Sequence, residues 1–232
     1  MKKVGSTFNL NRYKVFMFLD RVEAGQKLAE KLLKYKDMGP IVLAIPRGGV
    51  VVASEVASAL SCRLDLVIPR KIGAPNNPEL AVGALAKEGA VILNEELTKS
   101  LNISPDYLRE EIEKQVVEIK RRRKEYLGDR SSIDLRGKTV ILVDDGLATG
   151  YTSLAAIKAV REDKPEKVVL AVPVAPREAI ERLKTEVEEL ICLETPELFF
   201  AVGQFYYDFA QTTDEQVVEI LTRHHQNKEE ET

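Results

Sequence analysis

Apolar runs alternate with amphipathic segments along much of this chain, and this alternation most limits the fold that the chain can adopt. Helical spacing over residues 21–35 precedes the apolar run PIVLAI (residues 40–45). A helix from about Val50 to Leu60 then leads to LDLVIP (residues 64–69). Buried strands joined by crossover helices form parallel sheets with helices on both faces. The sequence therefore predicts an α/β fold.

The second half of the chain repeats this order. Apolar runs at residues 139–144, 167–174 and 187–193 alternate with helices that we expect at 153–161 and 176–184. Ligands of such sheets bind beyond the carboxyl ends of the strands. Two polar motifs follow strands in this way, IPRGGV in the first half and an acidic pair in the second half. We therefore expect both motifs at one edge of the sheet.

The region between the two halves has a different composition. Residues 70–85 are rich in Gly, Pro and Asn and indicate a long loop, which could form a short hairpin with AVILN at residues 90–94. One long helix is expected from Ser104 to Tyr126, with Ser104 as its cap and Pro105 at its first position. Its acidic residues come early and its basic residues late. The run KRRRK is therefore interpreted as a solvated helix end rather than a nucleic-acid site.

The composition excludes several classes of protein. The 232 residues suit one domain with an insertion, and 34 basic against 37 acidic residues give no strong case for nucleic acid or acidic membranes. The two cysteines, Cys62 and Cys192, lie far apart and suggest neither a disulfide framework nor a zinc site. The apolar patch at residues 15–19 is too short for a signal peptide or a membrane span. We expect a cytoplasmic protein.

The segment GLATGYTS (residues 146–153) combines small residues and hydroxyl groups where a strand gives way to a helix. Backbone N–H groups of such a turn, together with the positive end of the helix dipole, form an anion site that fits a phosphate monoester. No lysine precedes the Thr-Ser pair, so the segment is not a Walker A loop, and the chain has no GxGxxG dinucleotide motif. The sequence therefore predicts a different kind of phosphate site.

Asp144 and Asp145 stand directly before this turn. A carboxylate facing a phosphate at about 6 Å costs about 3 kcal/mol at an effective dielectric constant of 20, so the acids must face something else. Sugar hydroxyls donate hydrogen bonds to carboxylates, and the two features together predict a ribose 5-phosphate site. A second pocket, which binds anions, is predicted from Arg47 beside two glycines together with the pair Arg70 and Lys71.

The stretch VILVDDGLATGYTS (residues 140–153) resembles the phosphoribosyl-diphosphate signature of the type I phosphoribosyltransferases: hydrophobic residues, two acids, then Gly-x-x-Thr-Gly-x-Thr. IPRGG (residues 45–49) resembles the pyrophosphate loop of that family, in which the peptide before the first glycine is often cis. This resemblance implies that the Arg47–Gly48 peptide bond is the candidate for a cis bond in this chain. RKIG (residues 70–73) resembles the start of the flexible catalytic loop. The resemblance covers most of residues 20–195.

This resemblance implies transfer of phosphoribose from 5-phosphoribosyl 1-diphosphate to a nitrogenous base, with release of pyrophosphate. Asp144 and Asp145 would hold the ribose hydroxyls, with Mg²⁺ bound nearby through those hydroxyls or water. Catalytic roles fall to these two acids and Lys71. The 5-phosphate would be bound by Ala148, Thr149, Gly150, Tyr151, Thr152 and Ser153. The pyrophosphate would be bound by Arg47, Gly48, Gly49, Arg70 and Lys71.

The acceptor base stays open. Members of the family that use 6-oxopurines have an acidic residue three places after the second motif acid, where this chain has Ala148. The Ser-Tyr or Glu-Tyr pair of adenine-type catalytic loops is also absent. The family's base-binding hood comes from terminal segments. Its candidate here carries six aromatic residues that could stack on a base, pack a C-terminal lobe or form a dimer contact: Phe199, Phe200, Phe205, Tyr206, Tyr207 and Phe209.

We therefore expect a type I phosphoribosyltransferase-like core at residues 15–195, with a helical insertion at about 95–128. A C-terminal hood segment at residues 196–225 and a frayed tail at 226–232 follow. The expected partners are small molecules and further copies of this chain, for example in a dimer, without nucleic acid or membrane. The alternative to an enzyme is a regulatory module that binds phosphoribosyl diphosphate or a nucleotide without turnover.

Overall fold

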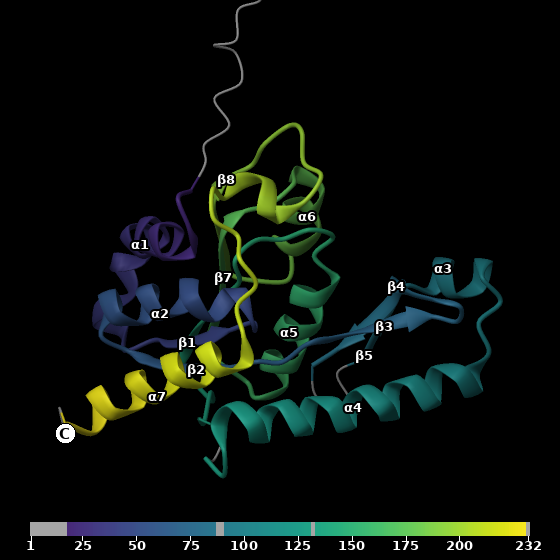
Figure 1. The fold of residues 1–232 in the computed structure, drawn as a ribbon, viewed down its shortest axis with the longest axis horizontal. Helices are drawn as coiled ribbons and strands as arrows, with labels where there is room; N and C mark the ends of the chain where they lie inside the picture. The colour runs from purple at the N-terminus through teal and green to yellow at the C-terminus, as the bar shows by residue number, and fades with distance from the viewer. Residues whose placement is uncertain (1–17, 87–90, 131–132, 231–232) are drawn as a thin grey trace, which may run out of the picture.

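The computed structural model describes residues 18–86, 91–130 and 133–230 (Figure 1). The start of the expected core at residue 15 and most of the apolar patch at 15–19 lie outside these residues. Within the described ranges, none of the helices is both long and apolar enough to cross a membrane.

The main sheet contains five parallel strands in the order β2-β1-β6-β7-β8. Ala44 at the end of β1 is in register with Leu66 of β2 on one side and Val143 of β6 on the other. These three strands therefore end at one edge of the sheet, as the sequence predicts. The strand bounds are β1 (Ile41–Ala44), β2 (Arg63–Leu66), β6 (Thr139–Val143), β7 (Lys167–Val174) and β8 (Glu189–Glu194).

Helices cover both faces of this sheet, which confirms the predicted α/β class. In β6, Val140 and Leu142 pack with α5 and α6, whereas Ile141 and Val143 pack with α1, α2 and α7. Figure 1 shows α1 and α2 on one side of the sheet and α5 and α6 on the other. The helix bounds are α1 (Arg21–Leu32), α2 (Gly48–Leu60), α5 (Tyr151–Glu162), α6 (Arg177–Leu183) and α7 (Asp214–Glu230), with a 3-10 helix η2 (Leu33–Met38) after α1.

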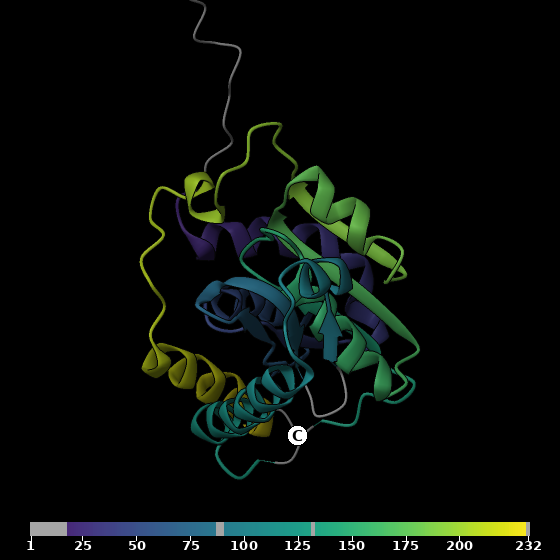
Figure 2. The ribbon, with the colours of Figure 1, turned by 90° about the vertical axis from the view of Figure 1, so that its right-hand side faces the viewer.

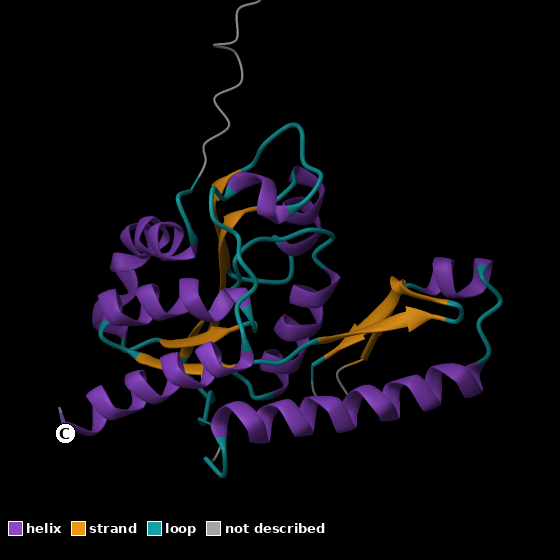
Figure 3. Ribbon diagram, viewed as in Figure 1, coloured by secondary structure: helices purple, strands orange, loops and turns teal. Residues whose placement is uncertain are grey.

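The prediction of a long loop at residues 70–85 is wrong. This region forms β3 (Arg70–Ala74) and β4 (Asn77–Leu85), which join β5 (Val91–Leu93) in an antiparallel sheet of order β3-β4-β5 (Figure 3). The hairpin suggested for residues 90–94 is confirmed by the pairing of β4 with β5. The strands are irregular, with register shifts on both sides of Gly73, where a Cβ would lie 2.7 Å from the Pro78 carbonyl oxygen. Glycine thus permits a close backbone crossing inside a strand.

The predicted long helix is confirmed as α4 (Pro105–Leu127), which follows the short helix α3 (Glu95–Ser100). The Ser104 hydroxyl accepts a hydrogen bond from the Tyr107 N–H, which caps the helix as expected. In the basic run, Arg121 pairs with Glu118 and Glu125, and Arg122 pairs with Glu118. The α4 helix lies under the antiparallel sheet and runs toward α7 (Figures 1 and 2).

The C-terminal part of the chain contributes to two different regions. Residues 195–213 are coil around a 3-10 helix, η3 (Val202–Phe205), and they lie near α1. The α7 helix then packs Val217 and Leu221 into the core beside α2 and the end of α4. Its backbone continues to Glu230, through most of the tail that we expected to be frayed.

Candidate active site at the carboxyl ends of the strands

The acidic pair lies where β6 ends, and its two carboxyl groups have different partners. The Asp144 carboxylate accepts a hydrogen bond from the Asp145 N–H (2.8 Å). The Asp145 carboxylate accepts one from Nε of Arg21 (2.7 Å), and these two side chains are only 16% and 11% exposed. Burial and then the neighbouring charge of Asp145 raise the pKa of Asp144 well above its usual value. Burial also raises the pKa of Asp145, against the opposing effect of Arg21.

The loop after β1 lies directly against this pair. A Cβ on Gly48 would lie 1.9 Å from the Asp145 Oδ2, and a Cβ on Gly49 would lie 2.9 Å from the Asp144 Cα. Only glycine permits this approach of two loops, because any larger residue would overlap the acids. The cis peptide bond of this loop is Pro46–Arg47, so the expectation of a cis Arg47–Gly48 bond is wrong.

The predicted 5-phosphate loop leads into α5. Gly150 caps the helix with a φ of 80°, a left-handed conformation that glycine adopts readily, and α5 begins at Tyr151, two residues before the helix start that we expected. Ala148 and Thr149 are exposed, and Tyr151 and Thr152 are half-buried. Ser153, in contrast, is buried (1% exposed).

Two residues that sequence reasoning missed contact this loop. Arg182 on α6 donates a hydrogen bond to the Thr149 carbonyl oxygen, and its guanidinium lies 4.6 Å from the centre of the Tyr151 ring. Asn94 follows β5 and donates to the Tyr151 hydroxyl (3.2 Å). Arg182 places a positive charge beside the predicted phosphate loop. No local motif marks it, because it comes from a separate helix.

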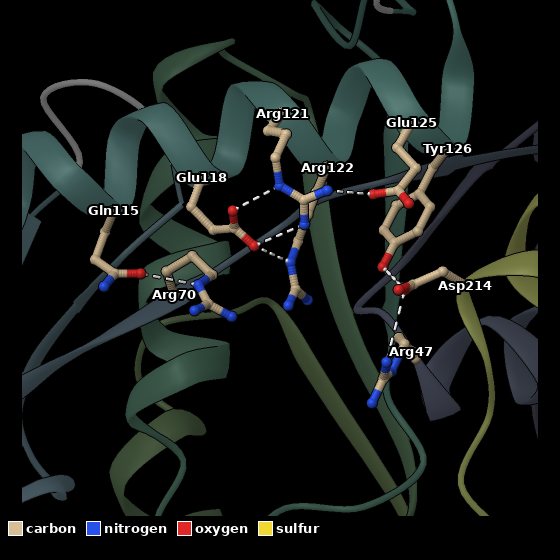
Figure 4. Close-up of polar contacts among 9 residues, drawn as sticks. All are labelled: Arg47, Arg70, Gln115, Glu118, Arg121, Arg122, Glu125, Tyr126 and Asp214. Atoms are coloured by element: carbon tan, nitrogen blue, oxygen red, sulfur yellow. Dashed lines mark hydrogen bonds and ion pairs between the residues drawn. The ribbon is translucent and has the colours of Figure 1, made fainter.

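Arg47 is joined to the C-terminal helix and to the insertion. Its Nη1 lies 3.7 Å from Oδ1 of Asp214, the first residue of α7, and the Tyr126 hydroxyl of α4 donates to the same oxygen (Figure 4). Burial raises the pKa of Tyr126 to about 12, so this hydroxyl keeps its proton at neutral pH. The guanidinium of Arg47 is thus held near Asp214.

The structure separates the two cations at the start of β3. Arg70 donates through Nε to the Gln115 side chain of α4 (2.9 Å), and burial is the main reason that its pKa is lowered (Figure 4). Lys71 is exposed, as expected for neighbours that point to opposite faces of a strand. Arg47 and Arg70 are therefore held by partners on different helices, Asp214 of α7 and Gln115 of α4.

The hood segment contacts the acidic pair directly. The Tyr206 hydroxyl donates to the Asp145 carbonyl oxygen (2.5 Å), and burial raises the pKa of Tyr206. Tyr206 and Phe205 are buried in a small apolar cluster with Phe18. Phe200 and Tyr207, in contrast, are 86% and 78% exposed. The aromatic residues of this segment therefore divide into rings that pack and rings that face solvent.

Comparisons with known proteins agree with this arrangement. The family model described as "Phosphoribosyl transferase domain" matches residues 18–210. The crystal structure of TT1426 from Thermus thermophilus has a TM-score of 0.76 and 44% sequence identity, and the match covers 89% of this chain and 98% of that chain.

Two curated proteins of Mycobacterium tuberculosis are also similar, "Putative phosphoribosyl transferase Rv0571c" of strain H37Rv and "Putative phosphoribosyl transferase MT0597" of strain CDC 1551. Each is 41% identical over 211 residues, which is 91% of this chain, and this chain spans about half (48%) of the length of each. On the family match, the sequence identity and the shared fold, the chain belongs to the phosphoribosyl transferase domain family and has its type I α/β architecture.

Proposed function

We propose that this chain transfers the phosphoribosyl group of 5-phosphoribosyl 1-diphosphate to a nitrogenous base and releases pyrophosphate. The observation that carries this proposal is the contact between the Asp145 carboxylate and Gly48. The acids that we assign to the sugar and the loop that we assign to pyrophosphate meet there. In a bound sugar diphosphate, C1 joins the ribose to the pyrophosphate and would therefore lie near both groups.

The reaction breaks the bond between C1 of ribose and a pyrophosphate oxygen, which keeps the electron pair. The lone pair of the acceptor nitrogen forms the new C1–N bond, and that nitrogen loses a proton. The sugar gains positive charge before the new bond is complete, and Asp144 and Asp145 provide negative charge beside it. Arg47 and Lys71 are the cations that we assign to the departing pyrophosphate.

The two carboxyl groups also fit a Mg²⁺ ion that is held mainly by the substrate. Within the described residues, no group of three or more His, Cys, Asp or Glu side chains is arranged to hold a metal ion. Mg²⁺ commonly uses one or two carboxylates together with substrate phosphates and water. Asp144 and Asp145 would hold it through the ribose hydroxyls or water. When bound, the ion would neutralise charge on the pyrophosphate.

Calorimetry with two separate ligands tests the assignment of the two loops. Arg47→Ala should lower the affinity for inorganic pyrophosphate by at least about tenfold, because a charged hydrogen bond is lost, and should leave ribose 5-phosphate binding within about twofold. The control is Arg63→Ala, which removes an exposed arginine at the opposite end of β2. Equal loss of both ligands would contradict the assignment of Arg47 to pyrophosphate.

The acid pair is tested with Asp144→Asn combined with Asp145→Asn. Binding of ribose 5-phosphate should fall by at least about tenfold. Thermal unfolding should change little, because asparagine keeps the size of each side chain and an oxygen that can accept its hydrogen bond. Asp37→Asn removes an exposed carboxylate as the matched control. A collapse of the fold in the double variant would mean that the acids are structural.

Turnover is measured as pyrophosphate release from phosphoribosyl diphosphate in the presence of a panel of purine and pyrimidine bases. At least one base should stimulate release, and the acid-pair variant should not respond to that base. Tight binding of phosphoribosyl diphosphate with no release on any base would favour the regulatory module instead.

A further inference from the structure

Arg21 connects the sugar-facing acids to the hood segment, and no motif of the sequence points to it. It is the first residue of α1, whose start is fixed by the Asp20 carboxylate accepting a hydrogen bond from the Glu23 N–H (2.9 Å). The α1 helix packs along α2, the helix that begins at Gly48. The Arg21 side chain therefore starts from a rigid position beside the loop that approaches the acidic pair.

The guanidinium of Arg21 has two hydrogen-bond partners from distant parts of the chain. Its Nε donates to the Asp145 carboxylate (2.7 Å), and its Nη1 donates to the Ala210 carbonyl oxygen (2.8 Å). The guanidinium carbon also lies 3.8 Å from the centre of the Phe209 ring, within cation–π range. Because the guanidinium is planar and rigid, these three contacts cannot be adjusted independently.

The surroundings limit how this group can move. The Arg21 side chain is 11% exposed, and a Cβ on Gly48 would lie 2.6 Å from its Nε. The backbone of the loop after β1 thus closes one side of the ion pair, while Phe209 closes another. A reorientation of the Asp145 carboxylate must shift Arg21, and the shift has to reach Phe209 and Ala210.

A second contact joins the same acid to the hood segment. The Asp145 carbonyl oxygen accepts the hydrogen bond from the Tyr206 hydroxyl (2.5 Å). The main chain of Asp145 is therefore attached to the hood directly, and its side chain is attached through Arg21. Both the position and the orientation of this carboxylate depend on the segment that follows β8.

We propose that Arg21 is a positioning residue that couples occupancy of the sugar site at Asp145 to the arrangement of the hood segment. This inference rests on the proposed function, which assigns Asp145 to the sugar hydroxyls. When those hydroxyls bind, the carboxylate divides its hydrogen bonds between the sugar and Arg21, and the hood adjusts through Phe209 and Ala210. The hood then responds to the donor substrate before the acceptor arrives.

A single indole provides the readout, because the sequence contains no tryptophan. The substitution Ala210→Trp places this indole at an exposed residue, whose backbone carbonyl oxygen accepts a hydrogen bond from Arg21. Ribose 5-phosphate and inorganic pyrophosphate are titrated separately into the full chain carrying this reporter. Indole emission reports the hood, and calorimetry reports binding. The series contains Arg21→Gln, Arg21→Lys and the control Lys31→Gln, which removes an exposed charge from the same helix.

Ribose 5-phosphate should change the indole emission of the reporter protein, and Lys31→Gln should leave this response intact. Arg21→Gln should weaken ribose 5-phosphate binding by about tenfold, the value of one charged hydrogen bond, leave pyrophosphate binding within about twofold, and abolish the emission change at saturation. Arg21→Lys should recover most of the affinity but not the emission change, because an ammonium group cannot bridge two acceptors while stacked on a ring.

An unchanged emission response in Arg21→Gln at saturating ribose 5-phosphate would overturn the coupling. Recovery of the response by Arg21→Lys would also overturn it, since charge alone would then be sufficient. Failure of the unsubstituted chain to bind ribose 5-phosphate would overturn the proposed function itself, and the inference with it.

Discussion

Replacing Gly48 by alanine tests whether the acidic pair is oriented by the loop after β1. The added Cβ would lie 1.9 Å from the Asp145 Oδ2 and 2.6 Å from the Arg21 Nε. The carboxylate must move by about 1.5 Å to reach an ordinary contact of 3.4 Å. It cannot do so freely, because it is 16% exposed and bound to Arg21 at 2.7 Å. The methyl group therefore either breaks this ion pair or displaces the loop.

Overpacking of this kind costs about 1–3 kcal/mol of unfolding free energy. We expect Gly48→Ala to lower the free energy of unfolding in urea by that amount, as followed by far-ultraviolet circular dichroism. Ribose 5-phosphate affinity should fall by at least about tenfold, because the carboxylate no longer faces the sugar in the same orientation.

A double-mutant cycle with Asp145→Ala identifies the source of the lost stability. This second change removes the carboxylate that the new methyl group would meet most closely, so Gly48→Ala should cost less stability in its background. The summed losses of unfolding free energy in the two single variants should exceed the loss in the double variant by at least about 1 kcal/mol. If Gly48→Ala is equally costly with and without the Asp145 carboxylate, the clash does not involve the acid, and the reasoning is refuted.

Three further changes test contacts around the site. Tyr126→Phe removes the hydrogen bond to Asp214 and should lower the free energy of unfolding in urea by about 1 kcal/mol; no change would mean that the bond contributes nothing. Gly146→Ala should cost about 1–3 kcal/mol in the same assay, because its Cβ would lie 2.5 Å from Val202, and Val202→Ala should relieve much of that cost. Burial lowers the pKa of His224, which lies 2.9 Å from the Ser54 hydroxyl, so the folded state favours the neutral ring. Stability should fall as the pH drops below about 6.5, and urea titrations should show a smaller fall in His224→Gln.

The main sheet could be predicted because its central strands, β1, β6 and β7, are buried on both faces. All five residues of β6 are buried, which makes the strand a continuous apolar run that is easily recognised between two helices. The antiparallel sheet could not be predicted with the same ease. Gly73 and Pro78 suggest a loop by composition, yet they face each other across an irregular pair of strands. Local turn signals are overridden there by packing against α4.

Some contacts of the predicted site residues are not encoded in the local sequence. Adjacent motif residues such as Asp144 and Asp145 stay together in any fold, so their place at a strand end followed from the sequence. Arg70 and Lys71 were grouped as cations, but strand geometry sends them to different surroundings, and α4 supplies the partner of Arg70. Ser153, the third residue of α5, is buried, whereas Ala148 and Thr149 of the same predicted phosphate loop are exposed.

The contacts that hold Asp145 in place show why a motif predicts the chemistry of a site better than it predicts the geometry of that site. Its partner Arg21 is 124 residues away in the chain, and Tyr206 is 61 residues away. Each contact exists only because α1 and the hood segment are placed beside the end of β6 by packing that involves neither acid, through Phe18 and Phe205. The motif therefore determines which groups we assign to the sugar, while segments outside it determine their orientation. Sugar binding should accordingly respond to changes in α1 and in the hood that leave every motif residue intact.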